Sequence, residues 1–149
     1  MGDTYSKMYY HIIFAVRNRK NHIDKSWKED LNKYITGIVK APKQKMMIIN
    51  GMSNHIHILL SSNPNVFIPD LVRDIKSSSS KWVNQNHFIN NKFNWQKGYS
   101  VFTVGHSQVK MVTNYIKNQE IHHSKKSFRE EYLEFLDSCE IEYDERYVF

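Results

Sequence analysis

Cysteine is nearly absent from this sequence. The chain has 149 residues and a single cysteine, Cys139. One thiol cannot form a disulfide within the chain, and it cannot supply the several thiolates of a cysteine-based zinc site. This usage fits a reducing cytosol, and the aromatic content of 13% is enough to build a compact apolar core instead.

Long apolar segments are missing as well. The longest apolar runs, such as residues 46–49 and the histidine-containing stretch 56–60, fall far below the ~20 residues of a membrane-spanning helix. Residues 1–7 contain no apolar core of a signal peptide. We therefore expect a soluble, cytoplasmic protein with no membrane partner. Because ~100–200 residues per domain is usual, we expect one domain over residues 1–149.

Three familiar catalytic patterns are also absent. With only five glycines, the chain has no glycine-rich loop that could cradle a phosphate, and it shows no convincing Ser-His-Asp order. It also lacks the cluster of three acidic residues around a strand that two-metal nucleases need. None of these three kinds of site is predicted.

Basic residues are in excess. Lys and Arg number 21 against 15 Asp and Glu, which gives a net charge of +6 and favours a polyanionic partner, nucleic acid before membrane. Interleaved with Trp82, Trp95 and Tyr99, the basic stretches are compatible with a groove for single-stranded nucleic acid, and equally with ordinary solvated surface. The residues that we expect to contact nucleic acid are Arg17, Arg19, Lys76, Lys81 and Lys110.

The apolar pattern predicts an α+β fold. Strands are expected at 9–16, 44–52, 55–60 and 98–104, and the second and third form a hairpin. Helices are expected from a capping box at Ser26 to Ala41-Pro42, from Pro69 to Val83, from an N-cap at Ser107 and from a second capping box at Ser127. This order predicts a ferredoxin-like, RRM-like antiparallel four-stranded sheet with helices on one face plus C-terminal helices.

Two histidines on one strand are the first candidate for chemistry. His55 and His57 are two residues apart, so both project from the same face while Ile56 and Ile58 face the core. Such a pair can chelate a divalent metal, although a chance His-x-His pattern remains the alternative. The residues that could complete the site are Gln119, Glu120, His106, His122, His123 and Asp70, and His122 with His123 is equally compatible with an exposed pair beyond a helix end.

A tyrosine and a glutamine form the second candidate. Tyr115 and Gln119 are four residues apart on a predicted helix and therefore face the same way. Tyr115 lies off the apolar stripe formed by Val109, Val112 and Ile116.

Taken together, four segments resemble a known family. They are Asn54-His55-Ile56-His57-Ile58-Leu59-Leu60, Trp95-Gln96-Lys97-Gly98-Tyr99, Tyr115-Ile116-Lys117-Asn118-Gln119, and Glu120-Ile121-His122-His123 followed by Ser127-Phe128-Arg129-Glu130-Glu131-Tyr132. The chain resembles the single-tyrosine HUH transposases of bacterial and archaeal insertion sequences and their REP-associated relatives, over nearly its whole length.

The resemblance implies a DNA transposase that cleaves and rejoins single-stranded DNA through a 5′-phosphotyrosine. Tyr115 would be the nucleophile, and His55, His57 and Gln119 would hold Mg²⁺ or Mn²⁺. The substrate would be single-stranded DNA with hairpin ends. The protein would work as a homodimer with active sites shared between chains, and the segment 105–107 could act as the hinge.

Two positions and two rival functions stay open. Asn54 stands where the family often has Asp, which puts a supporting hydrogen bond to His55 in doubt, and His11 recurs in the family without a role that we can assign. A hydrolytic metal nuclease and a catalytically silent nucleic-acid-binding relative are the alternatives. The intact set of His55, His57, Tyr115 and Gln119 favours catalysis.

Overall fold

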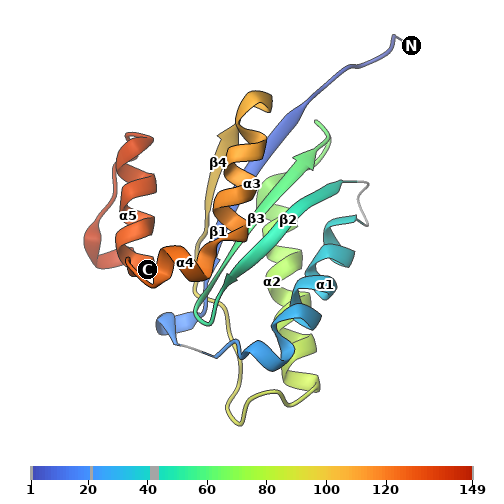
Figure 1. Cartoon of the computed structure of the whole chain (residues 1–149). Coiled ribbons are helices and arrows are strands. Elements are labelled where there is room, and N and C mark those ends of the chain that lie inside the picture. Colours follow the sequence, from blue (N-terminus) through green and yellow to red (C-terminus); the bar gives the residue numbers. More distant parts are fainter. Residues whose placement is uncertain (1, 21, 41–43, 149) are drawn as a thin grey trace.

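The four predicted strands form one sheet. The computed structural model describes residues 2–20, 22–40 and 44–148. Its strands are β1 (Met8–Ala15), β2 (Lys45–Met52), β3 (His55–Ser62) and β4 (Ser100–Val104). They pair antiparallel in the order β2-β3-β1-β4, so the predicted antiparallel α+β fold is confirmed (Figure 1).

The predicted β2–β3 hairpin closes tightly at Ser53-Asn54. Gly51 allows this, because a Cβ atom at that position would lie 2.1 Å from the backbone oxygen of His55. The hairpin therefore fixes the start of β3, where His55 sits, against the end of β2.

Helices α1 (Lys25–Lys40) and α2 (Ile68–Gln85) cover one face of the sheet (Figure 1). The expected capping box at Ser26 is wrong: the helix begins one residue earlier, and Asp24 Oδ1 accepts a hydrogen bond from the Ser26 backbone N–H at 2.9 Å. Pro69 lies in the first turn of α2, as predicted. The expected helix end at Ala41-Pro42 lies outside the described residues.

The C-terminal helices cover the opposite face. They are α3 (Val109–Lys117), α4 (Gln119–His123) and α5 (Phe128–Ser138), and Ser127 caps α5 as predicted. Ser107 does not cap α3, because residues 106–108 form a short 3-10 turn instead. The sheet thus lies between two helical layers (Figure 1).

One predicted helix is broken in two. The sequence predicts Tyr115 and Gln119 on a continuous helix, but Asn118 leaves helical geometry with φ −97° and ψ 31°. Tyr115 therefore lies in the last turn of α3, and Gln119 begins α4.

The two faces of the sheet are filled differently. Alternate strand residues such as Ile12, Phe14 and Ile58 pack with α1 and α2 in the larger apolar core. On the other face, apolar contacts form two smaller clusters, one around α5 and one around Ile116 of α3. None of the described helices combines the length and apolar character needed to span a bilayer.

Candidate metal centre and active site

His55 and His57 lie on the face of the sheet that α3, α4 and α5 cover. Both side chains are completely buried. Their strand neighbours in β1 are Ala15 and Ile13, which belong to the apolar cluster under α5. The predicted placement on one face therefore holds, and both imidazoles are withdrawn from solvent.

Two further residues converge on this pair. One potential ligand atom from each of His55, His57, His123 and Glu131 lies within 4.8 Å of all the others. Glu131 Oε1 is 2.9 Å from His57 Nε2 and 3.7 Å from His55 Nε2, and Glu131 Oε2 is 3.3 Å from His123 Nε2. Three imidazoles and one carboxylate could hold a metal ion.

Gln119 joins the same cluster. Its Oε1 atom lies 3.0 Å from both His55 Nε2 and His123 Nε2, and its Nε2 atom donates to Glu131 Oε2 at 3.4 Å. The side chain is fully buried. Gln119, the third ligand implied by the resemblance, thus lies beside His55 and His123, despite the break in the helix.

The hydrogen bonds fix the tautomer of His123. Its Nδ1 atom is 3.0 Å from the backbone oxygen of Lys126, and a carbonyl only accepts, so Nδ1 must carry the proton. In the neutral ring, Nε2 then presents a lone pair toward Gln119 Oε1 and Glu131 Oε2. A cation placed between these three acceptor atoms could be bound by all of them.

His55 shows the same arrangement. Its Nδ1 atom is 2.7 Å from Asn54 Oδ1, so the hydrogen bond that the change from Asp to Asn put in doubt is present. With Nδ1 protonated, His55 Nε2 also presents a lone pair toward Gln119 Oε1. Metal-binding histidines characteristically donate their other ring N–H to such an oxygen, which aims the ligand nitrogen.

His11 supports the third imidazole. Its Nε2 atom lies 2.8 Å from His57 Nδ1, and the His11 side chain is buried. Burial, with a further contribution from His57, lowers the pKa of His11 to about 3, so this ring is neutral. His11 can therefore accept the His57 Nδ1–H and leave His57 Nε2 free to bind a metal.

The charges of the cluster suit a cation. Burial lowers the pKa of His55, and the neighbouring His57 lowers it further, so His55 is neutral. Burial alone would raise the pKa of Glu131, but its contacts with His123 and His57 hold this pKa well below the usual range, so the carboxylate is charged. A buried carboxylate is costly without a compensating positive charge, which a bound cation would supply.

Tyr115 reaches this cluster within the same chain. Its hydroxyl donates to Glu131 Oε2, and its ring stacks on His122 with the centroids 4.4 Å apart. Burial raises the pKa of Tyr115 above its usual value, and the hydrogen bond to Glu131 raises it further. Without a metal, the phenol is therefore held in its protonated form.

The other candidate ligands lie away from the centre. Glu120 is exposed and pairs with Lys25, Asp70 pairs with Arg73, and His106 bonds to Tyr9. His122 contacts the Tyr115 ring rather than the cluster. The alternative of an exposed His122–His123 pair is wrong for His123, whose side chain is only 8% exposed.

Sequence reasoning missed Glu131 as a site residue. It lies three residues after Phe128 and four before Phe135, so it occupies the buried stripe of α5. An acidic residue at a buried position of an amphipathic helix is the signal that could have found it. No pattern in the sequence, however, indicates that this stripe faces His57.

The residues that were expected to contact nucleic acid lie in different parts of the structure. Arg17, Lys76 and Lys81 line hollows beside the segment 92–99, whereas Lys110 lies exposed on α3. The side chain of Arg19 lies outside the described part of the structure.

The three aromatic rings expected in the groove are placed differently. Trp82 stacks on Tyr34, with the ring centroids 4.9 Å apart. Trp95 is buried at the wall of the same hollow as Tyr99, and its indole N–H donates to Ser79. Tyr99 lines that hollow with a half-buried ring.

Comparison with known proteins points to one family. The sequence pattern of the IS200-like transposases matches residues 4–119. The chain is 24% identical over 117 residues to the ISDra2 transposase TnpA of Deinococcus radiodurans, covering 74% of this chain and 82% of that protein. His123 and Glu131 lie beyond the matched pattern.

Two solved structures share the fold. The crystal structure of a candidate transposase from Deinococcus radiodurans R1 is 25% identical, with a TM-score of 0.60 over 80% of this chain and 96% of that one. A REP-associated tyrosine transposase bound to a REP hairpin is 13% identical, with a TM-score of 0.62 over 83% of this chain and 73% of that one.

Proposed function

The chain belongs to the family of IS200-like transposases, and we propose that it cleaves and rejoins single-stranded DNA through a covalent bond between Tyr115 and a DNA 5′-phosphate. The observation that carries the proposal is the hydrogen bond from the Tyr115 hydroxyl to Glu131, whose other oxygen contacts His57. A nucleophile of the right type thus borders a group of converging metal ligands.

The proposed metal ligands are His55, His57 and Gln119, with His123 and Glu131 beside them. The lone pairs of His55 and His123 and the Glu131 carboxylate fit a divalent cation. The number of imidazole nitrogens favours Mn²⁺ over Mg²⁺, which prefers oxygen ligands. When bound, the metal supplies positive charge that stabilises the scissile phosphate and favours ionisation of a nearby hydroxyl.

The chain's own groups carry the remaining steps. The Tyr115 oxygen attacks the phosphorus, a bond forms between them, and the bond from phosphorus to the 3′-oxygen breaks. The departing strand takes up a proton and leaves as a 3′-hydroxyl. Glu131 already accepts the hydrogen bond from the phenol, so the Tyr115 proton leaves along that bond. The ester conserves the bond energy, and attack by another 3′-hydroxyl rejoins the DNA.

The substrate follows from the same proposal. One relative of the same fold was solved with a REP hairpin, and this chain carries a net charge of +6. Single-stranded DNA with hairpin ends is therefore the proposed substrate. A homodimer with shared sites stays a prediction. Within one chain, Tyr115 already contacts its own Glu131 and His57, so a shared site would require this contact to be exchanged between chains.

A covalent adduct separates this function from its rivals. Incubation with hairpin-containing single-stranded DNA and Mn²⁺ should yield a protein–DNA adduct that survives SDS. Tyr115→Phe should still bind the DNA, but its rate of adduct formation should fall by several orders of magnitude, because the nucleophilic oxygen is gone. Cleavage without any adduct would indicate a hydrolytic nuclease, and DNA binding without cleavage would indicate a silent relative.

A matched tyrosine variant controls this experiment. Tyr147→Phe also removes one phenol oxygen, but Tyr147 lies exposed in the C-terminal segment and takes no part in the metal cluster. It should form the adduct at the wild-type rate. An adduct that persists in Tyr115→Phe would exclude Tyr115 as the nucleophile, and Tyr99→Phe would then be the first variant to examine.

A further inference from the structure

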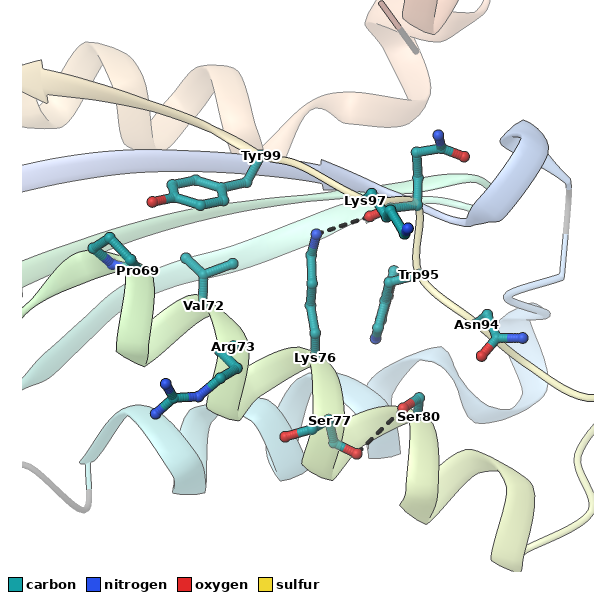
Figure 2. A pocket seen from close by; sticks show the side chains of 11 residues that line it. Pro69, Val72, Arg73, Lys76, Ser77, Ser80, Asn94, Trp95, Lys97 and Tyr99 are labelled. Atoms are coloured by element: carbon teal, nitrogen blue, oxygen red, sulfur yellow. Dashed lines mark hydrogen bonds between the residues drawn. The ribbon is translucent and has the colours of Figure 1, made fainter. Parts of the chain in front are cut away.

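A pocket of about 440 Å³ lies between α2 and the segment that leads into β4. It takes no part in the metal centre, which lies on the opposite face of the sheet. Figure 2 shows the Tyr99 ring on one side of the pocket, Pro69 and Val72 of α2 across from it, and Lys76 extending from α2 between Tyr99 and Trp95. The lining residues are Pro69, Val72, Arg73, Lys76, Ser77, Ser80, Asn94, Trp95, Gln96, Lys97 and Tyr99.

The walls of the pocket suit a flat, aromatic group. Tyr99 is half-buried, and Val72 and Pro69 supply apolar surface facing it. Trp95 is held rigidly by its hydrogen bond to Ser79 Oγ at 2.9 Å. Nucleic-acid bases stack on such aromatic side chains without regard to their sequence.

The charged groups of the pocket suit phosphate. Lys76 Nζ donates to two backbone carbonyls, Gln96 O at 2.8 Å and Gly98 O at 2.5 Å. Desolvation lowers the pKa of Lys76 to about 8, so the ammonium group is still mostly charged at neutral pH, and an anion beside it would raise the pKa again. Lys97 is exposed at the rim, and Arg73 lies there in ion pairs with Asp70 and Asp74.

The positive charge continues beyond this pocket. Two neighbouring hollows also include Asn94 in their walls, and their basic residues are Arg17, Lys20, Lys81 and Lys92. Among the described residues that line the three hollows there are seven Lys and Arg and no Asp or Glu. We name these hollows the basic track. Such a predominantly basic lining attracts the phosphates of a nucleic-acid strand.

The basic track begins near the metal centre. The Gln96 backbone N–H donates to Ala15 O at 2.8 Å, and Ala15 is the residue of β1 that pairs with His55. The track and the metal ligands therefore lie at the same end of the sheet, on opposite faces. A single strand that follows the track needs only to pass around this end to reach Tyr115.

We propose that the pocket holds the base of one unpaired nucleotide of the DNA substrate against Tyr99, while Lys76, Lys97 and the basic track bind the phosphates of the same strand. This inference rests on the proposed function, since it supplies that reaction with a second anchoring point for its DNA. The affinity for DNA would then have two contributions, one from stacking of the base on Tyr99 and one from the attraction between the basic side chains and the phosphates.

Binding in EDTA tests the proposal without cleavage. The probes are a fluorescent oligothymidylate of about 16 nucleotides and an abasic strand of the same length, which keeps the phosphates and lacks the bases. Wild-type protein should bind the thymidylate about tenfold more tightly than the abasic strand. Tyr99→Leu should lose this preference, and Tyr99→Phe, which retains the ring, should keep it.

A second pair of variants tests the phosphate contacts. Lys76→Gln combined with Lys97→Gln should weaken both probes by about tenfold and flatten the salt dependence of binding. Lys33→Gln combined with Lys40→Gln, which removes two exposed charges on α1, is the matched control and should leave both affinities unchanged. Equal losses in this control would show that only net charge matters and would overturn the proposal.

The outcomes distinguish this proposal from the proposed function. A Tyr99→Leu protein that melts like wild type and still prefers thymidylate overturns the pocket, while its covalent adduct at Tyr115 would stand. Wild-type protein that binds neither probe would overturn the pocket, and the adduct experiment with hairpin-containing DNA and Mn²⁺ would decide the proposed function separately. A Tyr99→Leu protein that no longer folds would be replaced by Lys76→Gln with Lys97→Gln, whose unchanged binding would equally overturn the pocket.

Discussion

The two faces of the central sheet use the same strands for opposite purposes. In β3, Ile56, Ile58 and Leu60 pack into the apolar core under α1 and α2, while His55 and His57 point to the other side. Burying each large aliphatic side chain stabilises the fold by about 1.5–3 kcal/mol. Burying the Glu131 carboxylate costs free energy unless a positive charge compensates it. The first face therefore stabilises the fold, whereas the second carries a buried negative charge that a cation would compensate.

Substitutions at neighbouring residues of β3 test the difference between the two faces most directly. Ile58→Ala should lower the free energy of unfolding by about 2–5 kcal/mol, because it leaves a cavity in the larger core. Manganese titration by calorimetry should still show one site per chain. Urea unfolding measures the first effect, and loss of manganese binding in the folded variant would contradict the separation of the faces.

His57→Ala is the complementary variant. It removes a ligand and should abolish manganese binding, as should His55→Ala combined with His57→Ala. In EDTA its stability should change by less than that of Ile58→Ala, since His57 contributes polar rather than apolar burial. Unchanged manganese binding in the double variant would reject the metal centre.

Glu131 is expected to give the next largest effect. Glu131→Gln keeps the shape of the side chain and removes its charge, so the affinity for Mn²⁺ should fall about 100-fold. Glu134→Gln on the exposed side of α5 is the matched control and should bind Mn²⁺ normally. Equal affinity in wild type and Glu131→Gln would exclude the carboxylate as a ligand.

Acid should destabilise the polar face specifically. The folded pKa of His11 is about 3, below its ordinary 6.5, so between these values only the unfolded chain takes up this proton. In EDTA, stability is therefore complete above pH 6.5 and falls as the pH decreases, by at most about 1.4 kcal/mol per pH unit for this group. His11→Leu should flatten the curve of unfolding free energy between pH 7 and pH 5. Parallel curves for the two proteins would contradict the neutral state of His11.

The smallest effect should come from Asn54. Its side chain only orients His55, so Asn54→Ala should weaken Mn²⁺ binding about tenfold and leave the stoichiometry unchanged. Asn63→Ala, at the other end of β3, serves as the control. An effect larger than that of Glu131→Gln would make Asn54 more than an orienting group.

The sheet and most helices could be predicted because their signals are local. A run of aromatic and β-branched residues identified β1, and the capping pattern at Ser127 located the start of α5. The placement of His55 and His57 on one face followed from the two-residue period of a strand alone. The break at Asn118 was missed because no glycine or proline marks it in the sequence.

The complete site depends on contacts between distant segments. Glu131 is separated from His57 by 74 residues, and no periodicity indicates that α5 packs on this face. The same limit applies to the aromatic residues: Trp95 and Tyr99 are four residues apart and line the same pocket, yet only packing decides that the first is buried and the second half-buried. Residue types could be predicted, and their partners could not.

The position of Glu131 has a consequence for reading genomes. The family pattern ends at residue 119, twelve positions before this carboxylate. A gene copy interrupted between these points would retain every signature residue and still be scored as an intact transposase. It would lack the carboxylate that completes the cluster of potential metal ligands and contacts Tyr115. Counting active copies of such elements therefore requires inspection of the segment that follows the recognised motif.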